Sequence, residues 1–373
     1  MKNIVSEWVV EDGLIKFYSG KENIIFSDNH HHFINGFCRL LGLSEEEGKN
    51  FVELVSKKAV EVLSSSFSEL DVDKKVEVLK LVSKEFFKIE NNPQDLKFTN
   101  SKILCNHDFD IVYENSIRNN KSYVLAGCSK CEYACLKNVN DKSIDLVNYE
   151  QEYYEGNDEK VGYGNYLKQS EWRLEKSKRQ LRQIQGLLKF LFENFKTKPK
   201  VLDVGSGYGF FRKALDDEGL EHDGIEISSF AIDTCKKEFG FNTYQGDLSS
   251  FCSSTKNKYD IVVMWDLIEH VTDPINVLKE VRSLLNENGI CCIRTPNLLS
   301  LEREIFRNHY HSLKLEHLYY FSPKSISLAL LKAELNPVFL TTETHLLSGF
   351  LGKDLNLFSR ILKGSDIFLI ASK

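Results

Sequence analysis

A short apolar run that breaks into a glycine-rich loop limits the fold of this chain more than any other feature. In "VLDVGSGYGFF", residues 201–211, the run ends at Asp203, and glycines follow at Gly205, Gly207 and Gly209. Such a stretch predicts a buried strand, a tight turn and the start of a helix. It therefore indicates a β–α unit, and the question is how many such units follow and what the loop binds.

Strand-like and helix-like segments alternate after this loop. Helical patterns at 209–219, 229–239 and 274–285 lie between apolar runs such as "HDGIEI", "YDIVVMW" and "GICCIRT". This alternation predicts a parallel sheet with helices on both faces. Two later runs, "NPVFLTTE" and "SDIFLIAS", are expected to add an antiparallel pair at one edge. We therefore predict a Rossmann-like, doubly wound α/β fold with a mostly parallel sheet and an antiparallel edge strand.

The spacing of the glycines argues against a dinucleotide. A dinucleotide loop has its third glycine three residues after the second, and Phe210 stands at that position. Asp203 adds a negative charge that repels a pyrophosphate but suits an ammonium group. Exposed N–H groups at a helix start would attract a carboxylate as readily as a phosphate. An amino acid, which carries both groups, is the better ligand for this loop.

Two carboxylates after the next strands extend this ligand. Glu226 ends the second strand, where it can accept hydrogen bonds from ribose hydroxyls, a position that nicotinamide enzymes also use. Asp247 follows the third strand and can accept from an adenine amino group, although in "GDLSS" it can equally cap a helix. An amino acid, a ribose and an adenine in succession describe S-adenosyl-L-methionine.

At this point the chain resembles a known family. The successive motifs "VLDVGSGYGFF", "GIEIS", "GDL" and "YDIVVMWDLIEHVTDP" are similar to those of class I S-adenosylmethionine-dependent methyltransferases, and "EHLYYFS" resembles the subgroup of ubiquinone-type O-methyltransferases. The resemblance implies a methyltransferase whose methionine moiety lies at Asp203, Gly205 and Gly207, the ribose at Glu226 and the adenine at Asp247. It implies further cofactor contacts at Ser206, Ile227 and Leu248, which flank these residues, and at Trp265 and Asp266, which form a wall beside the cofactor.

Two histidines are candidates for a catalytic base. His270, just beyond the fourth strand, lies where parallel strands present their carboxyl ends to a ligand. His317, in "LEHLYYF", is the second candidate. A structural role stays open for both, as a capping or packing residue for His270 and as part of an apolar segment for His317. Asn-Pro-Pro-Tyr and Asp-Pro-Pro-Tyr do not occur after the fourth strand, which weighs against methylation of DNA bases or glutamine.

A cysteine-containing segment precedes the methyltransferase-like part. Cys105 and His107, then Cys128 and Cys131, form two groups of possible zinc ligands, an arrangement similar to a zinc ribbon. Small segments of this kind begin several methyltransferases of the subgroup, usually with two CxxC pairs. Here Asp108 occupies the second cysteine position of the first pair. Bound zinc and a metal-free β-ribbon remnant both stay open.

These features predict three parts: a mainly helical domain at 1–98 of unknown role, a small β-rich ribbon at 99–150 and a methyltransferase domain at 151–373. In the first part, Ser44 and Glu47 have the spacing of a capping box, which predicts a helix start. Pro93 marks the expected linker.

Composition and charge restrict the partners. A formal net charge of -6 gives no general attraction to nucleic acid or to an anionic membrane, and no apolar run is long enough to span one. Nine cysteines, with Cys291 and Cys292 adjacent, suit a reducing cytoplasm. We expect a cytoplasmic enzyme that methylates a small molecule at oxygen, with nitrogen or carbon as the alternative accepting atoms. Two alternatives are an inactive binding or regulatory protein with this fold and a nicotinamide-dependent oxidoreductase.

Overall fold

The structure is a computed structural model that describes twelve stretches of the chain. They are residues 6–11, 14–19, 22–27, 43–65, 67–87, 104–118, 121–138, 151–155, 166–191, 198–314, 316–343 and 362–373. The expected linker around Pro93 and the boundary between residues 98 and 99 lie outside the described residues. Within the described residues, no helix combines the length and apolar character that crossing a membrane requires.

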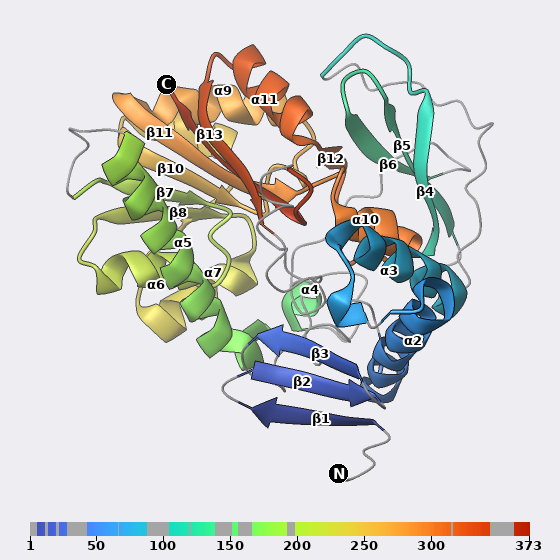
Figure 1. Cartoon of the computed structure of the whole chain (residues 1–373). Helices are drawn as coiled ribbons and strands as arrows, with labels where there is room; N and C mark the ends of the chain where they lie inside the picture. The colour runs from blue at the N-terminus through green and yellow to red at the C-terminus, as the bar shows by residue number, and fades with distance from the viewer. Residues whose placement is uncertain are drawn as a thin grey trace.

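A seven-stranded sheet forms the centre of the larger part (Figure 1). Its strand order is β13-β14-β11-β10-β7-β8-β9. The strands are β7 (Val201–Val204), β8 (His222–Glu226), β9 (Tyr244–Gln245), β10 (Tyr259–Trp265), β11 (Leu285–Pro296), β13 (Asn336–Glu343) and β14 (Asp366–Ser372). This confirms the predicted Rossmann-like, mostly parallel sheet. The antiparallel strand is β14, which pairs with β11 on one side and with β13 on the other, so that β13 forms the edge.

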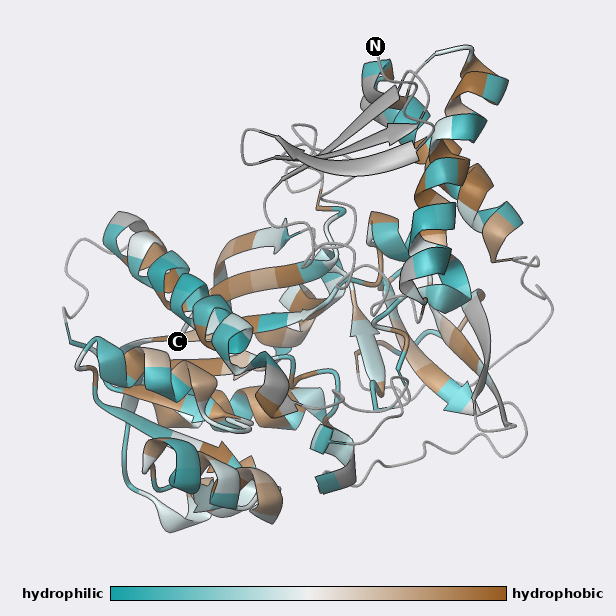
Figure 2. Cartoon of the chain, turned by 90° about the horizontal axis from the view of Figure 1, so that it is seen from below, coloured by the Kyte–Doolittle hydropathy of each residue, from teal (hydrophilic) through white to brown (hydrophobic). Residues whose placement is uncertain are grey.

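Helices cover both faces of this sheet, because successive side chains of β10 are buried on opposite faces. Ile261 and Val263 face a core shared with α5 (Ser170–Leu191) and α6 (Phe210–Asp217). Val262 and Met264 face the other core, to which α8 (Leu248–Ser254), α9 (Pro274–Leu284) and α11 (Pro323–Lys332) contribute. Figure 2 shows apolar residues concentrated on the strands of the sheet. Burial on both faces explains why these strands read as continuous apolar runs.

The cysteine segment forms a second sheet that the rest of the chain completes. β4 (Ile111–Arg118), β5 (Lys121–Cys128) and β6 (Tyr133–Asn138) are antiparallel neighbours. A fourth strand, β12 (Tyr319–Phe321), pairs with β6 and comes from the methyltransferase-like part. The two parts separated in sequence at residue 150 therefore share a sheet. No local pattern in the sequence indicates this pairing.

The N-terminal part contains strands as well as helices. β1 (Ser6–Glu11), β2 (Leu14–Ser19) and β3 (Glu22–Ser27) form an antiparallel sheet, so the expectation of a mainly helical domain described only the later half. α2 (Glu45–Leu63), the 3₁₀ turn η1 (Phe67–Glu69) and α3 (Val72–Phe86) follow. The predicted capping box is confirmed, because Ser44 and Glu47 exchange both hydrogen bonds at the start of α2.

The N-terminal helices do not form an independent core. Phe51 of α2 lies in one apolar cluster with Leu301, Ile305 and Phe306 of α10 (Leu301–Phe306), a helix that follows β11. Figure 1 shows α2, α3 and α10 side by side. Lys80 of α3 also donates to the Glu304 carboxylate at 2.6 Å. The N-terminal part is thus attached to the region that follows the central sheet.

Candidate cofactor and acceptor site

The glycine loop after β7 uses its own N–H groups. The amides of Gly205 and Ser206 donate to the Ile225 carbonyl oxygen at 2.9 and 3.0 Å, and Gly207 donates to Glu226 Oε2 at 2.8 Å. Gly209 donates to Ser206 O at 2.9 Å. These four loop amides already have acceptors within the protein. The expectation that the helix start attracts a carboxylate concerns the first turn of α6 (Phe210–Asp217) and stays a prediction.

Glycine is required in this bend. Gly205, Gly207 and Gly209 have φ values of 73°, 51° and 82°, which lie in the left-handed region. A Cβ at Gly205 would lie 2.9 Å from the Leu267 side chain, and one at Gly209 would lie 2.5 Å from Cys235 Sγ. The absence of a side chain at Gly205 and Gly209 therefore lets the loop pack closely against Leu267 and Cys235.

Two buried carboxyl groups lie at the ends of β7 and β8. Asp203 is 3% exposed and Glu226 is 5% exposed. Burial raises the pKa of Asp203 to about 7, although the positive charge of Arg212 opposes this shift. Burial also raises the pKa of Glu226, while its backbone N–H partners lower it. Glu226 accepts from the amides of Gly207, Ile227 and Ser228, so it both closes the loop and keeps limited capacity for ribose hydroxyls.

The predicted adenine end consists of one capping residue and two apolar residues. Asp247 caps α8: its Oδ1 accepts from the Ser250 amide at 2.8 Å and from the Ser250 hydroxyl at 2.6 Å. The capping alternative is thus confirmed, and the second oxygen of Asp247 is the one for an outside donor. Ile227 is 51% exposed although it is apolar. Leu248, the residue after Asp247, is buried. Ser206 Oγ is also buried, and it has no hydrogen-bond partner among the described residues.

Trp265 and Asp266 point in different directions at the end of β10. The centroid of the Trp265 ring lies 5.3 Å from that of Phe211, and the ring stacks on Phe368 with centroids 5.9 Å apart. Trp265 therefore packs in the core that the sheet shares with α5 and α6. Asp266 has φ 54° and binds Arg294 through both oxygens. Lys176 Nζ lies 3.7 Å away. Burial would raise the pKa of Asp266, but Arg294 and Lys176 hold it below its ordinary value.

The structure brings the two predicted histidines together. The rings of His270 and His317 meet edge to face, with centroids 4.7 Å apart. His317 Nδ1 lies 2.8 Å from the Ser312 carbonyl oxygen, so this nitrogen donates and Nε2 is the acceptor. Burial lowers the pKa of His270 to about 4 and that of His317 well below 6.5. Both rings are therefore neutral at pH 7, and each carries a lone pair on one ring nitrogen, but burial makes them weaker bases than an ordinary histidine.

The preceding glutamates are residues that sequence reasoning missed. Glu269 and Glu316 are each 1% exposed, and Glu269, His270 and His317 offer ligand atoms within 4.8 Å of one another. Burial raises the pKa of Glu269 well above its ordinary value, and its Oε1 has no partner among the described residues. The dipeptide Glu-His occurs in "IEHV" and "LEHL", but it also occurs in "LEHD" at 220–223 outside this site, so it is not a specific signal.

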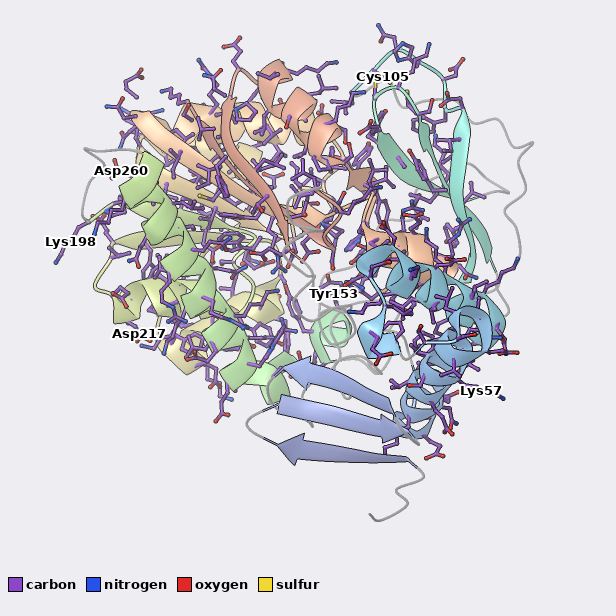
Figure 3. All side chains as sticks on the ribbon, viewed as in Figure 1. Lys57, Cys105, Tyr153, Lys198, Asp217 and Asp260 are labelled. Carbon is purple, nitrogen blue, oxygen red and sulfur yellow. The ribbon has the colours of Figure 1, made fainter. Side chains whose placement is uncertain are left out.

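A short helix covers the cofactor loop. Tyr154 of α4 (Gln151–Glu155) stacks on Tyr208 of the loop, with centroids 4.9 Å apart, and Tyr153 packs against Tyr154. Figure 3 shows Tyr153 near the middle of the molecule and Cys105 beside the small sheet. The tyrosine-rich stretch between the cysteine segment and the methyltransferase-like part therefore contacts the bend that follows β7.

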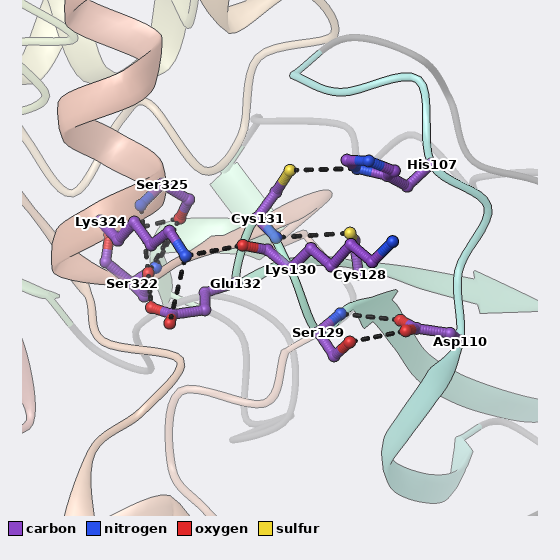
Figure 4. A network of polar contacts seen from close by, with 10 residues as sticks. All are labelled: His107, Asp110, Cys128, Ser129, Lys130, Cys131, Glu132, Ser322, Lys324 and Ser325. Atoms are coloured by element: carbon purple, nitrogen blue, oxygen red, sulfur yellow. Dashed lines mark hydrogen bonds and ion pairs between the residues drawn. The ribbon is translucent and has the colours of Figure 1, made fainter.

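The four predicted zinc ligands also converge. Cys105, His107, Cys128 and Cys131 offer atoms within 4.8 Å of one another, and His107 Nδ1 lies 3.6 Å from Cys131 Sγ (Figure 4). Cys128 is the last residue of β5 and the other three lie in loops beside the small sheet, and the three cysteines are free thiols. Three sulfurs and one imidazole nitrogen are a donor set that zinc prefers. The residues therefore fit a tetrahedral metal, and the early position of His107 does not prevent convergence.

Comparisons with known proteins find similar sequences and chains. Residues 176–339 match the family described as "Methyltransferase domain". Relatives named ubiquinone biosynthesis O-methyltransferase include one from Histophilus somni (strain 2336), which is 29% identical over 110 residues, or 27% of this chain and 46% of the relative. Another from Coxiella burnetii (strain Dugway 5J108-111) is 30% identical over 116 residues, 30% of this chain and 49% of the relative. The chain spans about half the length of these curated relatives.

A solved S-adenosylmethionine-dependent methyltransferase from Archaeoglobus fulgidus has 22% identity and a TM-score of 0.43, over 56% of this chain and 99% of its own.

Proposed function

The chain carries a class I S-adenosylmethionine-dependent methyltransferase domain, to which residues 176–339 belong, and from this premise we propose that it transfers the cofactor's methyl group to an oxygen of a small organic molecule. The observation that carries the proposal is the meeting of three strand ends. Asp203 and Glu226 lie at the ends of β7 and β8, and the half-buried His270 beyond β10 meets the buried His317, which precedes β12.

The cofactor would occupy the edge formed by these strand ends. Asp203 supplies a carboxyl group for the ammonium, Glu226 for the ribose and Asp247 for the adenine amino group. Ser206 Oγ and the exposed Ile227 side chain offer a hydroxyl and an apolar contact. The cofactor supplies an activated methyl group. The chain's own residues bind it, orient it and exclude water.

The acceptor would lie at the histidine pair. Methyl transfer is an in-line displacement, and much of its rate can come from positioning the nucleophile. A hydroxyl group also has to lose its proton, and the neutral imidazoles of His270 and His317 are the proton acceptors available. Oxygen as the acceptor atom rests on the names of the similar relatives and on this pair of bases.

A structural zinc ion at the cysteine cluster is part of the proposal. Cys105, His107, Cys128 and Cys131 would hold it, and its role would be to tie two loops of the small sheet together. Elemental analysis of protein purified without chelators should give about one zinc per chain. Cys128→Ser should release it, whereas Cys252→Ser, a cysteine of α8 outside the cluster, should not. Clean absence of metal would leave the metal-free ribbon.

Calorimetry measures whether the protein binds S-adenosylmethionine and its demethylated product, and so tests the proposed cofactor. Glu226→Gln should weaken both by about 1.5–3 kcal/mol, because a charged acceptor is lost while much of the hydrogen bonding to the loop is retained. Glu226→Ala should weaken them further, because the Gly207 amide also loses its partner. Tight NADH binding without S-adenosylmethionine binding would instead support an oxidoreductase.

Turnover separates an enzyme from a binding protein. Incubation of the protein with S-adenosylmethionine labelled in the methyl group and a fractionated metabolite extract should label a small molecule. Cofactor binding without label transfer to any fraction would favour the inactive binding protein. The identity of the labelled compound would show whether the accepting atom is oxygen, nitrogen or carbon.

A further inference from the structure

The turn that carries Cys128 and Cys131 is bonded directly to the strand that follows His317. We propose that this turn, when the cysteine cluster holds a metal, fixes β12 and thereby the position of His317, and that Glu132 is the positioning residue through which it acts. The inference rests on the proposed metal and acceptor sites. It assigns the cysteine segment a role in methyl transfer without contact with the cofactor.

The turn has an internal geometry suited to a metal. The Cys131 amide lies 3.4 Å from Cys128 Sγ, and the Glu132 amide donates to Cys128 O at 2.8 Å. Glu132 itself has φ 57°, a left-handed conformation that costs free energy for a residue with a Cβ. Such a residue keeps this conformation only where its surroundings determine it. The direction of the Glu132 side chain therefore depends on the turn.

Glu132 connects the turn to the start of α11 (Figure 4). Ser322, the N-cap of α11, donates its hydroxyl to Glu132 Oε2 at 3.1 Å and its amide to Glu132 O at 3.3 Å. Lys324 donates to the Lys130 carbonyl oxygen at 2.7 Å and lies 3.7 Å from Glu132 Oε1. Ser322 follows the last residue of β12 directly. The turn and the end of β12 are thus joined by main-chain and side-chain bonds.

The other end of β12 leads to the acceptor site. The amides of Leu318 and Tyr319 donate to the Glu269 carbonyl oxygen at 2.8 and 3.1 Å. His317 is the residue before them, and His270 is the residue after Glu269. Tyr319 also pairs with Cys135 of β6. A displacement of β12 would therefore change the relative position of the two histidines.

A metal would stabilise the turn by joining it to a second segment. His107 and Cys105 come from a loop before β4, whereas Cys128 ends β5 and Cys131 lies in the turn that follows it. Without a cation, thiols make only weak hydrogen bonds across this gap. A divalent cation bound by all four side chains holds both loops at fixed separation. Loss of the metal is expected to loosen Glu132, then Ser322 and β12.

Hydrogen–deuterium exchange of the full chain tests this order of events. We would compare peptides covering 316–322 and 201–211 in zinc-loaded protein, chelator-treated protein, Glu132→Ala and Glu132→Gln. Zinc content and affinity for the demethylated cofactor would be measured on the same samples. Glu280→Ala is a matched control, because Glu280 accepts from Ser249 in a similar exposed pair between α8 and α9.

Exchange at 316–322 should rise about tenfold or more after chelation and in Glu132→Ala, while 201–211 and cofactor affinity stay unchanged. Glu132→Gln should restore protection, because the amide oxygen can still accept from Ser322. Equal exchange at 316–322 in zinc-loaded protein, chelated protein and Glu132→Ala would overturn the proposal. If the protein takes up no zinc, the metal proposal fails, and the Glu132 variants alone decide whether the turn positions β12. Should Glu132→Ala not fold, Lys324→Ala removes the neighbouring bonds to Glu132 and to the Lys130 carbonyl oxygen and leaves the Ser322 cap of α11 in place.

Discussion

Asp203 and Glu226 are buried carboxyl groups on adjacent strands, but their surroundings prepare them for different partners. Three backbone amides already donate to Glu226, whereas the pKa of Asp203 rises to about 7 through burial. A carboxyl group with this pKa exchanges its proton near neutral pH. An ammonium group placed beside it would favour the ionised form.

Binding of the demethylated cofactor should therefore depend on pH through Asp203. Because only the ionised carboxylate pairs well with the ammonium, affinity should fall about tenfold between pH 8 and pH 6. Calorimetry at several pH values measures this. In Asp203→Asn the affinity should be lower and nearly independent of pH over the same range. An unchanged pH dependence in Asp203→Asn would assign the titration to another group.

His270 should act on the acceptor and not on the cofactor. His270→Ala is expected to leave cofactor affinity nearly intact while turnover falls by roughly 10²- to 10⁴-fold. The acid limb of the pH–rate profile should lie near pH 4, because burial lowers the pKa of His270 to about 4. Between pH 4 and pH 6.5 the unfolded chain binds a proton that the folded chain does not, so stability should rise with pH there.

His317→Ala supplies the comparison for this prediction. If His317 only lines the acceptor pocket, its loss should mainly raise the acceptor's KM. If it is the base, kcat should fall instead. Wild-type turnover in both variants would mean that methyl transfer here depends on positioning without a histidine base.

The sequence predicted which residues lie at the strand ends, but not which hydrogen bonds and ring contacts they and their neighbours already make. Motif spacing placed Asp203, Glu226 and His270 at strand ends, because parallel strands present their carboxyl ends at one edge. It could not show that loop amides already have acceptors or that the Trp265 ring lies in the core. Hydrogen bonds and ring packing depend on contacts between segments that are distant in sequence.

At the scale of elements, the bend between β7 and α6 depends on space as well as on φ. Gly209 packs against α7 (Ser229–Phe239), and an added Cβ would overlap Cys235 Sγ at 2.5 Å. Gly219, just after α6, has φ 65° and open space around it. Both glycines have a positive φ, but only Gly209 also lacks space for a side chain, so a comparison of the two distinguishes the cost of backbone strain from the cost of overlap.

Gly209→Ala should destabilise the fold more than Gly219→Ala. Both variants place alanine in the left-handed region, which costs about 1–3 kcal/mol. Only Gly209→Ala adds an overlap, worth about a further 1–3 kcal/mol. Denaturant titrations followed by circular dichroism measure both. Equal losses of stability would show that Cys235 moves aside freely.

The elements themselves were largely predictable, and their pairings only in part. The expected helix at 229–239 is α7 (Ser229–Phe239), and "YDIVVMW" is β10 (Tyr259–Trp265). Local periodicity and capping contain this information. The position of β14 between β11 and β13, and the pairing of β12 with β6, depend on contacts that no local window contains.

At the scale of the whole molecule, α10 belongs to two parts at once. It follows β11 in the chain but packs in the core of α2 and α3, where Phe306 is fully buried and lies 6.1 Å from Phe51 between ring centroids. The N-terminal helices and the region after the central sheet should therefore lose structure together.

Phe306→Ala should transmit instability into the N-terminal helices. Removal of a buried aromatic ring costs about 3–5 kcal/mol, and hydrogen exchange should increase in α2 and α3 although the change lies in α10. Leu331→Ala, at a side chain 55% exposed on α11, is the control and should leave exchange unchanged. Unaltered protection of α2 and α3 in Phe306→Ala would show that these helices are stable on their own.

The pairing of β12 with β6 also has a consequence for protein synthesis. β6 ends at Asn138, and its partner begins at Tyr319. At about 5–20 residues per second, ribosomes need roughly 10–40 seconds to make the intervening chain. During this interval β6 has an unpaired edge, and unpaired edges readily pair with other strands. A newly made chain is therefore exposed to wrong pairing until the segment after His317 has left the ribosome, and chaperones that protect strand edges would act on it in this period.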